Sequence, residues 1–219
     1  ILTRKLNVKG LAGKEISLVE LSVSHYLLVR ALEKNGMDER DVTVLNTSDS
    51  DIAAAFIANR RQEAVVTWNP LVMQIMQEPG VSNIFNSSDI PGEILDLMMV
   101  NTKTLKKNPA LGKALTGAWY ETMKIMTQRG SKANNALSIM AESAGCSLME
   151  YKMQLKTTAM FYQPKQAADY MSSSEIVKNM DYVRQFCFKH GLLGENARSA
   201  DEIGIKYPNG KIQGDAKNV

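Results

Sequence analysis

Short apolar runs alternate with helical periods along the first third of the chain. Each run is followed by polar turn residues and then by apolar positions spaced three and four apart, as on one face of a helix. This alternation with short loops is typical of a parallel sheet covered by helices, so we predict an α/β unit at about residues 10–92. Three strands are predicted in it: residues 16–21 (ISLVEL), 41–46 (DVTVLN) and 64–68 (AVVTW).

From about residue 93 the pattern changes to one that is almost entirely helical. One apolar strand is predicted at residues 95–100 (LDLMMV), and a helix starting at Asn108-Pro109 carries Trp119 on its apolar stripe. The methionines, of which the chain has 13, are concentrated in this half and are expected to fill a core. Helices that flank a sheet need the sheet, so we expect the missing strands to lie in a segment outside this sequence. Further helices are predicted at residues 131–143, 148–157 and 173–190.

Composition and charge are those of an ordinary globular protein. Hydrophobic residues make up 44% and charged residues 22% of the chain, and 26 basic against 23 acidic residues leave a net charge of +3. The basic residues are scattered, which argues against a nucleic-acid partner. Two cysteines, Cys146 and Cys187, are compatible with a disulfide or with two buried thiols. With only His25 and His190 beside them, we expect no metal site.

No catalytic constellation is found in the sequence. The nucleophile elbow, the phosphate loop, the dinucleotide fingerprint and the zinc-protease motif are all absent. The nearest glycine-rich stretch, residues 10–14 (GLAGK), precedes a strand, whereas a phosphate loop joins a strand to a helix. Ser24 and His25 are neighbours on a helix and point to different faces. We therefore predict neither an enzyme nor a bound cofactor.

Polar residues gather where the predicted strands end. Ligands of open parallel sheets bind outside the carboxyl ends of the strands, and short polar groups beside one large aromatic side chain suit a small polar solute. Each residue also has a purely structural alternative. The side chains of Ser22, Ser24, Asp51 and Asn69 would then only cap helices. His25 and Trp68 would belong to the core, and Glu93 and Asp96 would be solvated hinge residues. The candidate ligand-binding residues are Glu20, Ser22, Ser24, His25, Ser48, Asp49, Trp68, Asn69, Glu93 and Asp96.

Four features in this order resemble a known family. They are the glycine-rich entry at residues 9–14, the S-x-x-H start at Ser22, the D-x-x-A-A-F helix from Asp51 and the W-x-P turn at Trp68. Together they are similar to ABC-transporter solute-binding proteins of the nitrate, sulfonate, taurine and thiamine-precursor group. The nearest resemblance is to the subgroup of urea- or guanidine-transporter binding proteins, and it extends over nearly the whole chain.

The resemblance implies a two-lobed type II periplasmic binding protein fold, α/β in class, with a helix-flanked sheet in each lobe. On that pattern residues 1–9 are a crossover, 10–92 form lobe two and 93–219 are the returning, helix-rich part of an incomplete lobe one. We then expect a longer parent protein that is periplasmic or lipid-anchored outside the cell. Its partners would be a small solute and, transiently, an ABC permease of the inner membrane.

The strand ends also suggest the charge of the solute. The carboxylates there include Glu20, Asp49 and Glu93, and no lysine or arginine accompanies them. Paired carboxylates favour N–H donors such as urea or guanidinium over an anion, although taurine or another sulfonate stays open. Two other classes share this fold: the effector domain of a LysR-type regulator, which needs an upstream helix-turn-helix, and a thiamine-pyrimidine enzyme, which depends on histidine and iron.

Overall fold

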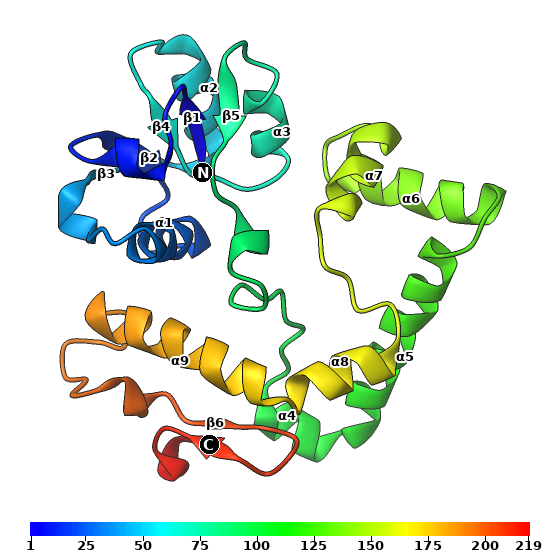
Figure 1. The fold of residues 1–219 in the computed structure, drawn as a ribbon. Helices are drawn as coiled ribbons and strands as arrows, with labels where there is room; N and C mark the ends of the chain where they lie inside the picture. The colour runs from blue at the N-terminus through cyan, green and yellow to red at the C-terminus, as the bar shows by residue number, and fades with distance from the viewer. The chain divides into compact units, whose positions relative to one another are not determined.

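The computed structural model describes residues 1–219, and the chain divides into two compact units (Figure 1). The first unit combines Ile1–Ile94 with Ser174–Val219, and the second unit is Leu95–Ser173. The α/β region predicted at residues 10–92 thus lies within the first unit, together with the C-terminal 46 residues. The assignment of residues 10–92 to lobe two and of residues 93–219 to the returning part of lobe one stays a prediction.

A five-stranded sheet with the order β3-β2-β4-β1-β5 lies at the centre of the first unit. The three strands predicted from the sequence are β2, β3 and β4, and they run parallel. The strand β1 lies antiparallel between β4 and β5. It comes from the segment that the resemblance assigns to a crossover. The strands are β1 (Leu2–Arg4), β2 (Glu15–Leu18), β3 (Thr43–Asn46), β4 (Ala64–Val65) and β5 (Val81–Asn83).

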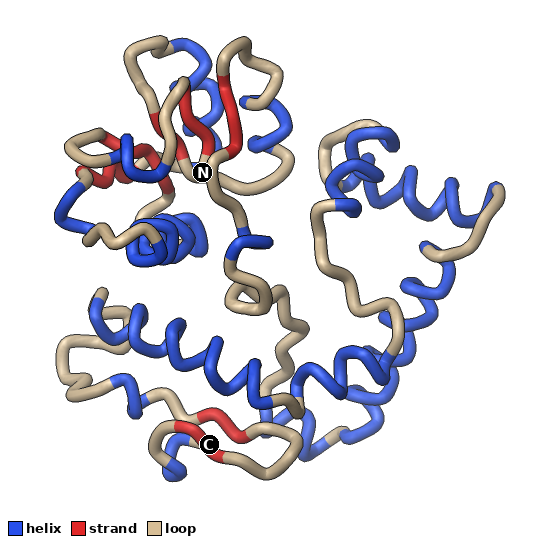
Figure 2. Tube along the Cα trace, viewed as in Figure 1, coloured by secondary structure: helices blue, strands red, loops and turns tan.

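Each face of this sheet carries its own core, because side chains alternate along a strand. On one face Ile16, Leu18 and Val66 pack with α1 (Val23–Lys34), and Phe186 of α9 (Ser174–Lys189) joins the same cluster. On the other face Leu2 and Val65 pack with Phe56 of α2 (Asp49–Ala58) and Ile75 of α3 (Leu71–Ile75). Helices therefore cover both faces of the sheet, as the strand–helix alternation predicts (Figure 2). Short 3₁₀ helices complete this part of the unit: η1 (Val8–Leu11), η2 (Glu39–Asp41) and η3 (Ser87–Asp89).

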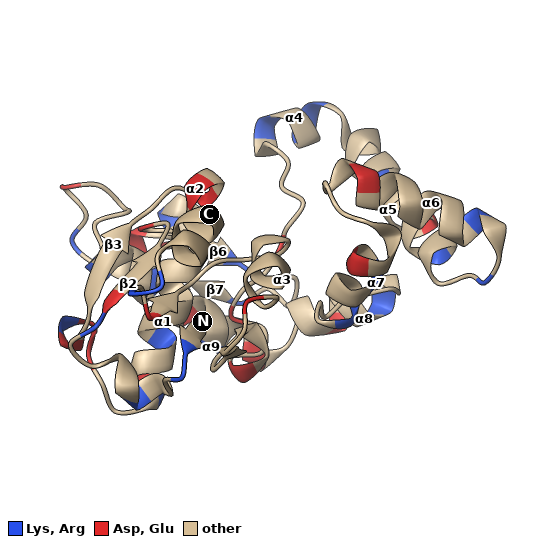
Figure 3. Cartoon of the chain, turned by 90° about the horizontal axis from the view of Figure 1, so that it is seen from above, with Lys and Arg blue, Asp and Glu red and all other residues tan.

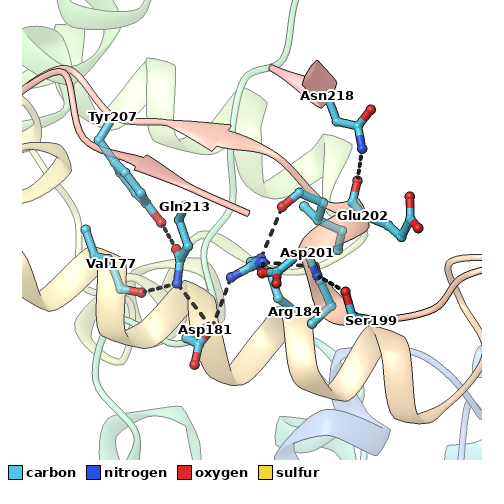
Figure 4. A network of polar contacts seen from close by, with 11 residues as sticks. Val177, Asp181, Arg184, Ser199, Asp201, Glu202, Tyr207, Gln213 and Asn218 are labelled. Atoms are coloured by element: carbon cyan, nitrogen blue, oxygen red, sulfur yellow. Dashed lines mark hydrogen bonds and ion pairs between the residues drawn. The ribbon is translucent and has the colours of Figure 1, made fainter. Parts of the chain in front are cut away.

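A buried arginine holds the C-terminal segment against α9 (Figure 4). The Arg184 guanidinium donates to the backbone oxygens of Ala200 (3.0 Å) and Ile203 (3.2 Å) and to Asp201 Oδ1 (2.6 Å). Gly214 has a φ of +78°, and a Cβ there would lie 2.0 Å from the Ile203 oxygen, so only glycine fits. The elements of this segment are η4 (Ala200–Glu202), β6 (Ile205–Lys206), β7 (Ile212–Gln213) and η5 (Ala216–Asn218).

The second unit is built from helices alone. From α4 to α7 each helix packs on the next, and Lys152 Nζ donates to Asn134 Oδ1 at 2.8 Å to link α7 to α6. Both cysteines are free: Cys146 lies in this unit and Cys187 in α9. No helix of the protein is long and apolar enough to span a bilayer. The helices are α4 (Thr102–Lys107), α5 (Pro109–Met126), α6 (Ser131–Ser143), α7 (Leu148–Lys156) and α8 (Pro164–Met171).

The strand predicted at residues 95–100 is wrong. The segment has no regular structure, and Leu97, Met98 and Met99 are 53%, 53% and 85% exposed. An extended segment becomes a strand only when another strand pairs its backbone N–H and C=O groups, and the second unit contains none.

Candidate functional site

The carboxyl ends of the three parallel strands meet at one edge of the sheet. Leu18 of β2 lies opposite Asn46 of β3, and Ser17 of β2 lies opposite Val65 of β4. The residues that follow are joined across this edge, because the Glu20 N–H donates to Asn46 Oδ1 at 3.0 Å. We call residues 19–22, 46–49 and 67–69 the strand-end rim.

The end of β4 presents two buried polar atoms without a hydrogen-bond partner. They are Thr67 Oγ1 and Asn69 Oδ1, and they flank the half-buried Trp68. The sequence predicts Asn69 as the N-cap of the next helix, but the N-cap of α3 is Pro70, so the Asn69 side chain has no capping role. A buried polar group without a partner is costly, which marks this end of the rim as a place where a ligand group can bind.

Thr67 was not among the predicted site residues. It is only 8% exposed and lies inside the apolar run AVVTW. A single hydroxyl within such a run, directly before the aromatic residue at the strand end, was the available signal.

The starts of α1 and α2 form the rest of the rim. Ser22 caps α1 by accepting from the Ser24 N–H at 3.1 Å, as the capping alternative expects. Ser48 is the N-cap residue of α2, yet its hydroxyl donates to Asp51 Oδ2 at 2.6 Å and accepts no helix N–H. Glu20 and Asp49 are exposed on the rim, so both carboxylates can reach a solute. Figure 3 shows acidic residues in α2.

Four of the predicted site residues lie away from the rim or are engaged by other side chains. Ser24 and His25 are 3% and 2% exposed within α1, and both ring nitrogens of His25 are engaged, Nδ1 by the Leu21 N–H and Nε2 by Glu39. Asp96 is exposed and belongs to the second unit. Glu93, the fourth, is buried in an ion pair. The candidate site at the rim is therefore narrower than the predicted set. Its residues are Glu20, Ser22, Ser48, Asp49, Trp68 and Asn69, with Thr67 added.

Glu93 is the centre of a buried polar cluster on α1. Its carboxylate accepts two hydrogen bonds from Arg30, at 2.7 and 3.0 Å, and one from the Tyr26 hydroxyl at 2.5 Å. Burial and the hydrogen bond to Glu93 raise the pKa of the Tyr26 hydroxyl well above its usual range. With its lone pairs used in this way, Glu93 ties the end of the Ile1–Ile94 segment to α1.

Two hollows of the structure lie elsewhere. One of about 360 Å³ is lined by residues of α1 and α9, including Arg30 and Tyr182, and one of about 480 Å³ lies in the second unit beside Tyr120 and Pro164. No predicted site residue lines either hollow. Neither of these hollows includes the rim, which is distinguished by its chemistry.

One group of side chains has the composition of a metal site. The ligand atoms of His25, Glu39 and His190 lie within 4.8 Å of one another, and this candidate cation site is empty. The sequence predicts no metal site because its histidines are few and far apart. The fold brings them together from the start of α1 and the end of α9.

A family model matches the part of the chain that contains the sheet and the rim. The match covers residues 6–133, more than half of the chain, and its description is NMT1/THI5-like. The chain belongs to the NMT1/THI5-like family. This membership confirms the nitrate/sulfonate/taurine group to which the sequence motifs are similar.

Solved structures of sulfonate-binding proteins share the fold. The alkanesulfonate-binding protein SsuA of Xanthomonas axonopodis pv. citri, bound to MOPS, matches 91% of this chain at 19% identity and a TM-score of 0.66. The periplasmic aliphatic sulphonate-binding protein SsuA of Escherichia coli matches 87% of this chain at 18% identity and a TM-score of 0.63. The periplasmic sulfonate-binding protein SsuA of Methylobacillus flagellatus KT matches 87% at 12% identity and 0.68. The predicted fold class, an α/β periplasmic binding protein fold with a helix-flanked sheet, is confirmed.

This chain of the NMT1/THI5-like family is shorter than the proteins to which it is similar. It covers 66%, 60% and 58% of the three SsuA chains, and no curated protein sequence matches it. The SsuA proteins are binding proteins by name, and the prediction that this chain is not an enzyme agrees with these matches.

Proposed function

We propose that this chain is the solute-binding component of a periplasmic ABC importer and that the strand-end rim supplies one side of its solute site. The observation that carries the proposal is the pair of buried, partnerless oxygens, Thr67 Oγ1 and Asn69 Oδ1, beside Trp68. A solute that hydrogen-bonds to both oxygens would remove the cost of leaving them unpaired. The indole of Trp68 adds an apolar wall, which is the combination that suits a small polar ligand.

The acceptors of the rim favour a solute rich in N–H donors. Asn69 Oδ1 accepts only, and the carboxylates of Glu20 and Asp49 lie on the same edge without a lysine or arginine. Urea and guanidinium present several N–H groups in a plane and pair well with such acceptors. We therefore propose an amide-like solute as the first candidate.

A sulfonate such as taurine is the second candidate. The likeness to three sulfonate-binding proteins supports it. The rim also contains donors for an anion, because the N-termini of α1 and α2 and the Thr67 hydroxyl lie there. Taurine carries an ammonium group as well, which the exposed carboxylates would receive.

A titration followed by NMR separates these solutes. The indole signal of Trp68 and the side-chain amide of Asn69 are expected to shift with the solute that binds. A solute of four heavy atoms, at about 1.5 kcal/mol per atom, binds no tighter than about tens of micromolar, whereas taurine can bind more tightly. No shift with urea, guanidinium or taurine up to high millimolar concentration would overturn the proposed function.

Two variants test whether the rim is the place of binding. Asn69→Leu and Thr67→Val each remove a partnerless oxygen, so both are expected to weaken solute binding while leaving stability unchanged or slightly raised. Thr43→Val is the matched control, because Thr43 is exposed at the opposite end of β3. If Thr43→Val weakened solute binding as much as Thr67→Val does, the solute would not bind at this end of the rim.

Periplasmic location and contact with a membrane permease belong to the same proposal. They are supported by the periplasmic sulfonate-binding proteins that share the fold. The effector-domain alternative receives no support from the comparisons, which match the chain to binding proteins.

A further inference from the structure

The turn that carries the centre of the rim holds a leucine in an unfavourable backbone conformation. Leu21, between Glu20 and Ser22, has a φ of 61°, in the left-handed region that non-glycine residues rarely adopt. Its side chain is 44% exposed, so packing of that side chain does not hold the turn. The Ser22 N–H and hydroxyl both donate to the Val19 oxygen and close the turn from one side.

His25 closes the turn from the other side. The Leu21 N–H donates to His25 Nδ1 at 3.2 Å, and because an amide N–H can only donate, Nδ1 must be unprotonated. The ring proton is then on Nε2, which lies 2.7 Å from Glu39 Oε1 and donates to it. His25 is 2% exposed, so these two contacts fix the neutral Nε2–H tautomer.

The next histidine in the cluster lies between two acceptors. His190 Nδ1 lies 2.9 Å from the Phe186 oxygen, and His190 Nε2 lies 3.0 Å from Glu39 Oε2. A carbonyl oxygen and a carboxylate oxygen both only accept, so a proton on each ring nitrogen would satisfy both contacts. The His190 ring stacks on Phe186 with the centroids 4.1 Å apart.

The same hydrogen bonds argue against a cation between the three groups. To bind a metal through Nε2, His25 would have to move its proton to Nδ1, where it would face the Leu21 N–H. Two donors would then oppose each other, and the left-handed turn would lose its support. A bound proton on His190 satisfies every contact that a metal ion would break.

We propose that His25 is a positioning residue of the solute site, because it holds the Leu21 turn of the rim. His25 is itself oriented by Glu39, and Glu39 is contacted in turn by His190 from a distant part of the chain. This inference rests on the proposed function in that the rim is taken to bind the solute. His190 is 151 residues from Glu39 in sequence, so the shape of the rim depends on α9 being docked.

The tautomer can be tested on the unmodified chain. Two-bond ¹⁵N–¹H spectra of the two histidines are expected to show His25 protonated only at Nε2 and His190 protonated at both nitrogens, with the Leu21 amide protected from exchange. A His25 protonated at Nδ1, or zinc binding to both histidine rings at micromolar concentration, would overturn the proposal. This measurement uses the unmodified chain without a solute, so it does not depend on whether a variant folds.

A matched pair of variants separates the two contacts of His25. In His25→Asn the side-chain oxygen replaces Nδ1 and keeps the acceptor for Leu21, whereas His25→Gln keeps the donor to Glu39 and loses that acceptor. We expect His25→Gln to weaken binding of the solute found in the titration by about three- to tenfold, the value of one hydrogen bond, and to remove the protection of the Leu21 amide. His25→Asn is expected to retain both.

The outcomes distinguish the two proposals. Equal loss of solute binding in both variants, at unchanged thermal stability, would show that His25 does not act through Leu21. If the unmodified chain binds none of the three solutes, the proposed function fails, while the Leu21 exchange rates in the two variants still decide whether His25 holds the turn.

Discussion

The two units of this chain bury their apolar side chains to very different extents. In the first unit both faces of the sheet carry a core, with Phe56, Leu28 and Ile16 fully buried. In the second unit Trp119, predicted on a core stripe, is 47% exposed, and Met149 is 71% exposed. The same apolar periodicity is present in both units, so what differs is the presence of a sheet against which a helix can pack.

The comparison shows how each unit obtains its order. Helices of the second unit begin at local signals, such as the capping box of Ser147 and Glu150 at α7 and the proline at the first position of α5. Order in the first unit depends on contacts between residues far apart in sequence.

The chain has two tryptophans, Trp68 in the first unit and Trp119 in the second. Fluorescence of the Trp119→Phe chain therefore reports the first unit, and fluorescence of the Trp68→Phe chain reports the second.

The largest expected effect breaks the core of the first unit. Phe56→Ala leaves a cavity under β1 and β4 and is expected to cost about 3–5 kcal/mol of unfolding free energy, measured by urea denaturation through Trp68. The control is Phe161→Ala in the second unit, where the ring is 38% exposed and its loss, followed through Trp119, should cost clearly less. Equal losses would contradict the contrast between the units.

The next effect separates a buried charge from an exposed one. Arg184→Met leaves the Ala200 and Ile203 oxygens without their donor, so we expect a loss of about 1–3 kcal/mol and faster hydrogen exchange over residues 200–215. Lys165→Met in the second unit removes an ion pair with Asp169 whose side chains are 81% and 63% exposed. That change should stay within about 0.5 kcal/mol. A larger loss from Lys165→Met than from Arg184→Met would reverse the argument.

A smaller effect tests the local origin of order in the second unit. Ser147→Ala removes the N-cap of α7 and is expected to cost about 1 kcal/mol, seen as fraying of residues 148–151 by NMR. Ser143→Ala is the control, since that hydroxyl only donates to the Ile139 oxygen within α6. If Ser147→Ala left α7 intact, tertiary packing and not capping would hold the helix.

The smallest effect depends on pH and concerns Glu39 in the first unit. Burial raises the pKa of Glu39, but the hydrogen bonds from His25 and His190 outweigh it, so the pKa lies below its usual value of 4.5. A depressed carboxyl pKa stabilises the folded state at pH values above the unfolded pKa, and this stabilisation is lost as the pH falls through the folded pKa. The difference in stability between the wild type and Glu39→Gln should therefore shrink below about pH 4.5. A difference that is the same at pH 7 and pH 3 would show that Glu39 is not stabilised in this way.

The sequence by itself determined the elements whose signals are local. The parallel strands β2, β3 and β4, the helix Ser131–Ser143 and the family follow from periodicity, caps and short motifs, because each of these depends on residues within a few positions of one another. It also placed Trp68 and Asn69 at the carboxyl end of a strand, where the rim lies.

Tertiary structure alone decided the features that depend on distant partners. Residues 95–100 have the composition of a strand but no strand to pair with, and Asn69 has the position of a cap but no helix N–H to accept. His25 was expected to bind the solute, yet its buried ring lies between the Leu21 N–H and Glu39, and Glu39 also contacts His190, which is 151 residues after Glu39 in the chain. Pairing across such distances is set by how the elements pack, and no pattern within a window of neighbouring residues contains that information.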